Sequence, residues 1–369
     1  MTIISSLTTA QIQALSTAAI AVLTAADMAS ITTTQVPVLT TAQLAVLTTS
    51  QLAVLNSAQV AALTTAQVAS FGTAQISGFS TAGLAGLETA DVVALSTAQV
   101  AALSSAQLKA WTTTTFAAIE TADIAALTTS AIKGLTTAQV AALSTAQMVA
   151  LTTAQVANLS TAAVARITTA DVAAMTTAQV AALTPAQVAA LTTAQVAGMG
   201  TAQVAAFGTA GLAGLETADM VALSTAQAAA LGSAQLAAIA TATLAAMETA
   251  DLAALSSGAI KGLTTAQLSA LTSAQTSALT TAQVSLLSTT QIAALGTLQA
   301  AAITTAGIVA LTTAQMAGWG TAQLAALTTS QVVALETADI VALNATQVGA
   351  FSTIKIAAMS AAQISALFL

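Results

Sequence analysis

The chain of 369 residues combines 56% hydrophobic residues with only 5% charged ones, which excludes an intrinsically disordered polymer because disorder requires low hydrophobicity and high charge. Its net charge of −7 and the absence of a basic patch exclude nucleic acid as an expected partner. There is no Cys and no His, which removes thiol nucleophiles, imidazole bases and the commonest transition-metal ligands, so we do not expect an enzyme.

The first residues, Met1 to Leu7, carry no basic segment and no long apolar core, so no cleaved signal peptide is predicted there. Along the rest of the chain, Thr and Gln interrupt the apolar residues so often that no run of 18 apolar residues occurs. We therefore do not expect a membrane-spanning helix.

An eight-residue repeat, or octad, runs through the chain without an insertion or deletion and is typified by Leu-Thr-Thr-Ala-Gln-Val-Ala-Ala. Every eighth residue from Leu7 to Leu367 is Leu, Ile, Met, Phe or Trp, and a second apolar position, starting at Ile4, lies three residues before each. Such an array predicts one continuous solenoid over residues 1–369. Residues 77–147 resemble residues 205–275, which indicates an internal duplication.

Each octad has the start signal of a helix. The residue after the large apolar position is nearly always Thr, Ser, Asn, Gly or Glu, and Gln or Asp follows three residues later in most octads. This is the spacing of a capping box, and Pro185, directly after Thr184, fits the first position of a helix. The octad therefore predicts a new short helix every eight residues. Pro37 lies deep inside its octad and predicts an irregular turn there.

One long helix is disfavoured because, at about 100° per residue, each octad advances the apolar stripe about 80° beyond two turns, and the stripe would spiral around the helix. A β-solenoid is the alternative, since Thr and Val favour strands. Ala and Gln, which fill about half of the octad, favour helices. We therefore predict an all-α solenoid of very short capped helices.

Substitutions within the octad suggest the length of one coil. Two sets of residues each share one position when the sequence is counted in steps of 32: Asp27, Asp91, Asp123, Asp219 and Asp251, and Gly72, Gly200, Gly232 and Gly296. Because each such step spans four octads, this pattern predicts a four-sided coil with one short helix on each side.

Paired carboxylates are the chemically most suggestive motif. They recur as Glu88 with Asp91, Glu120 with Asp123, Glu216 with Asp219, and Glu248 with Asp251. In a coil of four octads, each pair would lie beside the next pair, and a set of four carboxylates is a candidate Ca²⁺ site because Ca²⁺ prefers oxygen ligands. The same carboxylates also suit helix N-termini without any metal, because they complement the helix dipole. We predict no other cofactor.

Across its whole length, the sequence resembles low-complexity octapeptide tracts of the Leu-Thr-Thr-Ala-Gln-Val-Ala-Ala type in large bacterial secreted and surface proteins. The resemblance implies a structural or adhesive role. It also implies an extracellular or cell-surface location, which the protein would reach without a visible cleaved signal peptide.

Both ends of the repeat are apolar, whereas soluble solenoids cover their end layers with polar capping repeats. The candidate contact residues are Ile3, Ile4 and Leu7 at one end, and Ile364, Leu367, Phe368 and Leu369 at the other. A head-to-tail contact that does not close produces a fibre. We therefore predict a structural subunit that polymerises with copies of itself into an extracellular filament or matrix fibre. Alternatives are an ice- or surface-binding array of Thr side chains, or an adhesin or scaffold module.

Overall fold

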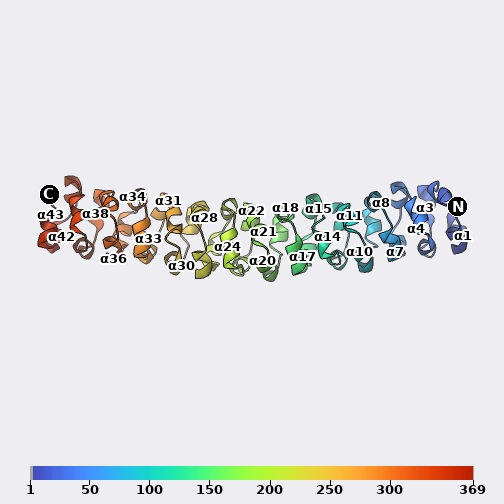
Figure 1. The fold of residues 1–369 in the computed structure, drawn as a ribbon, viewed down its shortest axis with the longest axis horizontal. Coiled ribbons are helices and arrows are strands. Elements are labelled where there is room, and N and C mark those ends of the chain that lie inside the picture. Colours follow the sequence, from blue (N-terminus) through green and yellow to red (C-terminus); the bar gives the residue numbers. More distant parts are fainter. Residues whose placement is uncertain (1–2, 369) are drawn as a thin grey trace. The chain divides into compact units, whose positions relative to one another are not determined.

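A computed structural model of the chain describes residues 3–368. These residues form only helices and the turns between them, so the predicted all-α fold is confirmed and the β-solenoid alternative is wrong for the described part. The chain divides into two compact units, Met1–Ala182 and Leu183–Leu369, and in each unit short helices follow one another in chain order (Figure 1). The octad spacing itself continues unbroken from one unit to the next.

Unit 1 contains one short helix in each described octad, two of them 3-10 helices (η). They are η1 (Ile3–Ser6), α1 (Thr9–Gln13), α2 (Thr17–Ala21), α3 (Ala25–Ser30), η2 (Val36–Val38), α4 (Thr41–Ala45), α5 (Thr49–Leu52), α6 (Ser57–Ala61), α7 (Thr65–Ala69), α8 (Thr73–Gly78), α9 (Thr81–Leu84), α10 (Thr89–Val93), α11 (Thr97–Ala101), α12 (Ser105–Lys109), α13 (Thr113–Ala117), α14 (Thr121–Ile124), α15 (Thr129–Lys133), α16 (Thr137–Ala141), α17 (Thr145–Ala150), α18 (Thr153–Ala157), α19 (Thr161–Val164), α20 (Thr169–Ala174) and α21 (Thr177–Ala181).

Unit 2 follows the same rule, with one 3-10 helix. Its helices are α22 (Pro185–Ala189), α23 (Thr193–Ala197), α24 (Thr201–Ala206), α25 (Thr209–Leu212), α26 (Thr217–Ala222), α27 (Thr225–Ala229), α28 (Ser233–Ala238), α29 (Thr241–Leu244), α30 (Thr249–Ala254), η3 (Ala259–Gly262), α31 (Thr265–Ser269), α32 (Ser273–Ala278), α33 (Thr281–Leu286), α34 (Thr289–Ala293), α35 (Thr297–Ala302), α36 (Thr305–Val309), α37 (Thr313–Ala317), α38 (Thr321–Ala326), α39 (Thr329–Val333), α40 (Thr337–Val341), α41 (Ala345–Val348), α42 (Thr353–Ala358) and α43 (Ala361–Ala366).

A capping box starts most of the described helices, as predicted. At α4, the Thr40 hydroxyl accepts a hydrogen bond from the Gln43 backbone N–H (3.2 Å), and the Gln43 side-chain oxygen accepts one from the Thr40 backbone N–H (2.8 Å). Pro185 is the first residue of α22, where its missing N–H costs no helical hydrogen bond. Pro37 lies in the 3-10 helix η2, so the irregular turn predicted there is confirmed.

Each corner is built from two extended residues. The large apolar residue at the end of the octad is extended, as at Leu223 (φ −63°, ψ 136°) and Leu279 (φ −60°, ψ 129°), and the next residue is the extended N-cap of the following helix. No described residue has a positive φ, so the corners need no glycine. This explains how an octad of ordinary residues can turn the chain repeatedly.

Both apolar positions of the octad form the core. In a typical octad, Val60 is 0% and Leu63 is 6% exposed. The second apolar position is smaller or polar at Ala228, Thr276 and Ala300, which are nevertheless buried. The two Trp side chains also belong to the core, and their ring N–H groups donate to backbone carbonyls of the preceding coil, Trp111 to Leu84 (2.9 Å) and Trp319 to Ile292 (3.1 Å).

The coil is shorter than the four octads that the sequence pattern predicts. Helices in extensive contact are three octads apart, as α5 with α8 and α37 with α40, whereas hydrogen bonds between coils join residues 26 to 31 apart. A coil therefore holds between three and four octads, and the start of each helix lies against the end of a helix in the coil before. The duplication at residues 77–147 and 205–275 has an offset of 128 residues, a multiple of 32, and it accounts for the coincidence of Asp91 with Asp219 and of Asp123 with Asp251. It does not account for Asp27 or for the Gly set, which the structure leaves without an explanation.

At some glycines the backbones of successive coils approach closely. A Cβ atom placed on Gly86 would lie 2.0 Å from the Ser57 carbonyl oxygen, and one placed on Gly134 would lie 2.3 Å from the Ser105 Cβ, in each case in the preceding coil. The two glycines share one octad position, and the two serines are each the first residue of a helix. These contacts fix which residues of neighbouring coils lie opposite each other.

Candidate functional site

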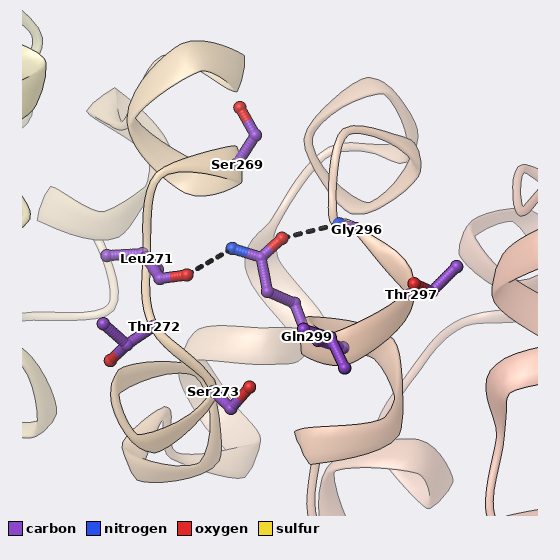
Figure 2. A pocket seen from close by; sticks show the side chains of 8 residues that line it. Ser269, Leu271, Thr272, Ser273, Gly296, Thr297 and Gln299 are labelled. Carbon is purple, nitrogen blue, oxygen red and sulfur yellow. Dashed lines mark hydrogen bonds between the residues drawn. The ribbon is translucent and has the colours of Figure 1, made fainter.

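The interface between successive coils is held by a recurring Gln amide. The Gln155 side-chain oxygen accepts a hydrogen bond from the Thr152 N–H (2.7 Å), while its NH₂ group donates to the carbonyls of Ile124 (2.8 Å) and Leu127 (2.7 Å) in the preceding coil. This side chain is 1% exposed. Figure 2 shows the same arrangement at Gln299, which accepts from the Gly296 N–H and donates to the Leu271 carbonyl (2.6 Å). One amide thus joins the start of its own helix to the end of an earlier one.

The chemistry of helix ends explains this arrangement. The last carbonyls of a helix have no partner within it, and a buried carbonyl without a donor destabilises the fold. A Gln amide has two donor hydrogens and one acceptor oxygen, so it can serve both helix ends at once. Gln links with donations to carbonyls 28 and 31 residues earlier occur in both units, at Gln35, Gln43, Gln51, Gln67, Gln75, Gln99, Gln107, Gln139, Gln155, Gln179, Gln227, Gln235, Gln267, Gln283, Gln299, Gln315, Gln331 and Gln363.

This second role of Gln was not predicted from the sequence, although the sequence contains a signal for it. Glu would serve a capping box as well as Gln does, yet Glu never occupies this octad position. Only the amide supplies donors for the preceding coil, so the preference for Gln over Glu at this position favours a role for those donors.

Buried Asp side chains replace Gln at some octads. Asp91, Asp123, Asp171, Asp219, Asp251 and Asp339 are each at most 6% exposed. An ionised carboxylate cannot donate to the preceding coil. It accepts instead, as Asp123 accepts from the Thr97 hydroxyl (2.5 Å) and Asp171 from the Thr145 hydroxyl (2.6 Å), each 26 residues earlier.

The surroundings of three Asp carboxyls, Asp27, Asp219 and Asp339, shift their pKa values, and not all in the same direction. Burial raises the pKa of Asp219 and of Asp339 above its usual value, and the nearby Glu216 and Glu336 charges raise them further, although backbone N–H groups at these two Glu residues oppose the shift. In contrast, hydrogen bonds from the Thr24 hydroxyl and backbone N–H lower the pKa of Asp27 in the first coil.

The predicted four-carboxylate sets do not form in the described residues. Residues 3–368 contain no group of three or more acidic, His or Cys side chains that could hold one metal ion. The shorter coil is the physical reason, because pairs four octads apart do not lie directly against each other. The Asp91 carboxylate accepts from the Glu88 backbone N–H (3.2 Å), as the dipole explanation expects. Ca²⁺ binding by Glu88, Asp91, Glu120, Asp123, Glu216, Asp219, Glu248 or Asp251 stays a prediction.

The first coil of unit 1 exposes one side of the core. Leu7, Leu15 and Leu23 are only half-buried, whereas the corresponding Leu47 and Leu55 of later coils are each 4% exposed. Together with Ile4, Ala19 and Asp27, these three Leu side chains line a hollow of about 220 Å³. Gln11 is exposed, whereas the corresponding Gln43 and Gln51 of later coils are each 2% exposed. The Ile3 side chain lies outside the described part.

The last coil of unit 2 exposes the other side of the core. Val348, Ile356 and Ile364 are half-buried, whereas Val332 and Ile340 in preceding octads are 0% and 1% exposed. Leu367 is half-buried and Phe368 is 84% exposed; Leu369 lies outside the described residues. The Leu position of the octad therefore faces the preceding coil, and the Val or Ile position faces the following one.

Unit 2 also has a shallow hollow of about 320 Å³ where Gly296 lacks a capping side chain (Figure 2). Ser269, Ser273 and Leu298 line it, and Leu298 is 76% exposed. The most buried polar group there, the Gln299 amide, is already engaged by the Gly296 N–H and the Leu268 and Leu271 carbonyls. The hollow therefore offers no buried polar group with an open partner.

The octad matches a known family of repeats. The sequence matches the ALTTAQ repeat over residues 28–65, 36–73, 84–115, 116–153, 148–185, 177–209, 212–247, 244–281, 300–337 and 332–368, which together span well over half of the chain. The chain belongs to the ALTTAQ-repeat family. This confirms the predicted resemblance to octapeptide-repeat proteins of the Leu-Thr-Thr-Ala-Gln type. A comparison with curated proteins found no match to this ALTTAQ-repeat chain.

The described helices of this ALTTAQ-repeat protein are all short. None of the helices within residues 3–368 is long and apolar enough to cross a membrane. This agrees with the prediction that the octads do not form a membrane-spanning helix.

Proposed function

We propose that this ALTTAQ-repeat protein is a structural subunit that associates head to tail with copies of itself into a filament or matrix fibre. The observation that carries the proposal is that the two end surfaces are complementary. The first coil presents half-buried Leu7, Leu15 and Leu23, and the last coil presents half-buried Val348 and Ile356. Inside each unit, these same two kinds of surface cover each other at every step between coils.

The hydrogen-bonding groups of the two end coils are also complementary, with amide donors in the first coil and backbone carbonyls in the last. Within each unit, Gln side-chain amides donate to backbone carbonyls of the preceding coil. The exposed Gln11 amide could donate in the same way to backbone carbonyls in the last coil of a neighbouring copy. The last coil is a source of such carbonyls, because Gln363, the final Gln of the chain, donates to Val332 and Leu335. A second copy would supply donors to the carbonyls that follow these two.

The octad predicts the register of the contact. If the octad count continues from Leu367 of one copy to Leu7 of the next, Gln11 falls 28 positions after Phe351 and 31 after Val348. These are the separations at which Gln amides bind carbonyls within each unit. We therefore expect Gln11 to donate to the Phe351 and Val348 carbonyls of the neighbouring copy.

An open chain of such contacts grows into a fibre because a heterologous contact that does not close adds subunits without limit. We place this fibre outside the bacterial cell or on its surface, since similar octapeptide tracts occur in secreted and surface proteins. Labelling intact cells with an antibody to the protein tests the location, and labelling that appears only after lysis would contradict it.

Light scattering and electron microscopy of the purified protein over a range of concentrations test the association. We expect mass to grow with concentration and filaments to form. The variant Leu15→Lys places a charge in the exposed apolar layer of the first coil and should abolish the filaments. Ala45→Lys is the matched control, because Ala45 is exposed on the side of unit 1 and should leave assembly unchanged.

A wild-type protein that stays monomeric at every concentration would contradict the proposal. So would filaments that are equally sensitive to Leu15→Lys and Ala45→Lys, because the contact would then not lie at the end of the solenoid.

A further inference from the structure

The buried Asp339 carboxyl stands at an octad position where other octads carry a Gln amide. Eight residues earlier, Gln331 donates to the Ala300 carbonyl (2.9 Å) and the Ile303 carbonyl (2.6 Å). The equivalent carbonyls for Asp339 belong to Ile308 and Leu311. A carboxylate has no hydrogen to offer them, so ionised Asp339 leaves the link between the end of α36 and the start of α40 without its usual donor.

One oxygen of Asp339 has no partner. Its Oδ2 atom is buried and accepts no hydrogen bond, and the whole side chain is 2% exposed. The other side of the carboxyl interacts with the Thr313 hydroxyl, which lies 26 residues earlier, as in the other Asp octads. A buried oxygen without a donor is costly for a carboxylate, whereas a protonated carboxyl can itself act as the donor.

A short side chain at this octad position can reach the preceding coil. The Thr243 hydroxyl occupies it in α29 and donates to the Leu215 carbonyl, 28 residues earlier, at 3.2 Å. The carboxyl oxygens of Asp extend one bond further than a Thr hydroxyl. A protonated Asp339 is therefore long enough to donate to the carbonyl of Leu311.

We propose that Asp339 is a proton-dependent link between coils, in which the neutral carboxyl donates a hydrogen bond to the Leu311 carbonyl and the ionised carboxylate breaks this link. Acid then tightens the contact between the end of α36 and the start of α40, and neutral pH loosens it. The link lies within unit 2 and does not depend on association between copies.

The electrostatic surroundings support this assignment. α40 packs against α37 and α43, and neither helix carries a charged residue. Glu336, at the N-cap of α40, is the nearby charge, and it disfavours a second negative charge at Asp339. Burial and Glu336 raise the pKa of Asp339, while the Thr313 hydroxyl and the Glu336 backbone N–H lower it, and the net direction is upward.

The sign of the pH effect follows from that direction. A carboxyl whose pKa is raised by folding contributes most stability below its unfolded value of 3.8, and that contribution is lost as pH rises through the folded value. Asp27 must behave in the opposite way, because its pKa is lowered and its contribution is lost as pH falls.

The test compares wild type with Asp339→Gln, which restores the usual amide, by chemical denaturation from about pH 4 to about pH 7. We expect the unfolding equilibrium constant of wild type to rise about tenfold relative to Asp339→Gln over this range. Gln331→Asp should create a second link of the same kind and add a similar pH dependence. Asp27→Gln is the control. Between wild type and this variant, the difference in the pH dependence of the unfolding equilibrium constant should have the opposite sign.

Carbon NMR of the Asp339 carboxyl in wild type gives an independent measurement, and it should titrate above 3.8. The proposal would be overturned if the unfolding equilibrium constants of wild type and Asp339→Gln changed in parallel with pH and the Asp339 carboxyl titrated at or below 3.8. It would also be overturned if Ca²⁺ at neutral pH stabilised wild type but not Asp339→Gln, because the carboxylate would then be a cation ligand.

Discussion

At the scale of single residues, the Gln amide links sequence to fold most directly. Its oxygen completes the capping box of its own helix, and its NH₂ group satisfies the carbonyls at the end of a helix in the preceding coil. Both functions are local chemistry, but only the first lies within one octad. For that reason the cap could be predicted from the octad alone, whereas the bridge between coils needed the structure.

Gln155→Glu separates these two functions. The variant keeps an oxygen for the Thr152 N–H but places a carboxylate against the carbonyls of Ile124 and Leu127. We expect it to destabilise the fold by about 2–4 kcal/mol at neutral pH, because a buried charge would face two acceptors. Denaturation with urea measures this loss.

Gln11→Glu is the matched control, because Gln11 has the same capping box but is exposed in the first coil. Its effect should stay within about 0.5 kcal/mol. Equal losses for Gln11→Glu and Gln155→Glu would show that capping alone explains the Gln, and that donation to the preceding coil contributes nothing.

At the scale of the helix, the described helices have three to six residues, and isolated helices of that length are unstable in water. Each helix depends on its cap and on the coils beside it. The sequence predicted where helices start, because Thr, Ser and Pro act on their own neighbours, as Thr184 and Pro185 do at α22. It did not predict the coil length, because the register between coils depends on contacts such as Gly86 with Ser57, which no single octad contains.

Thr192→Ala tests the contribution of a cap. The Thr192 hydroxyl accepts a hydrogen bond from the Gln195 backbone N–H (3.2 Å), and its removal should cost about 1 kcal/mol. Thr192→Ser retains the hydroxyl and should be close to wild type. Thermal unfolding followed by circular dichroism measures both variants, and equal melting temperatures for Thr192→Ala and Thr192→Ser would contradict the role of the cap.

At the scale of the whole molecule, each coil within a unit covers the Val and Ile side of the coil before it with its own Leu side. The two end coils leave one side of each kind half-covered, at Leu15 and at Ile356. The sequence predicted apolar ends from Ile4 and Leu7, but not which side of the octad each end exposes, because Ile4 is 3% exposed whereas Leu7 is half-buried. Because the two ends expose different apolar sides of the octad, the proposed contact joins the first coil of one copy to the last coil of another.

Disulfide cross-linking between copies tests this central claim most directly, because the natural chain has no Cys. Ala14 shares the octad position of Gly86 and Gly134, which approach Ser57 and Ser105 of the preceding coil, and the continued octad places Ala14 in the same relation to Thr353 of the neighbouring copy. Both residues are exposed within a single chain. Ala14, unlike Gly86 and Gly134, already carries a Cβ atom, so the neighbouring coil must stand further from it than the 2.3 Å that a Cβ on Gly134 would leave. We therefore expect the variant with Ala14→Cys and Thr353→Cys to place the two Cβ atoms near the range of about 3.5–4.5 Å that a disulfide needs.

On oxidation, we predict a ladder of disulfide-linked oligomers on a non-reducing gel. A control with Ala14→Cys and Thr321→Cys, in which Thr321 holds the same octad position in an earlier coil, should remain monomeric. A monomeric product from the first variant, or the same ladder from both, would contradict head-to-tail stacking in the register of the octad.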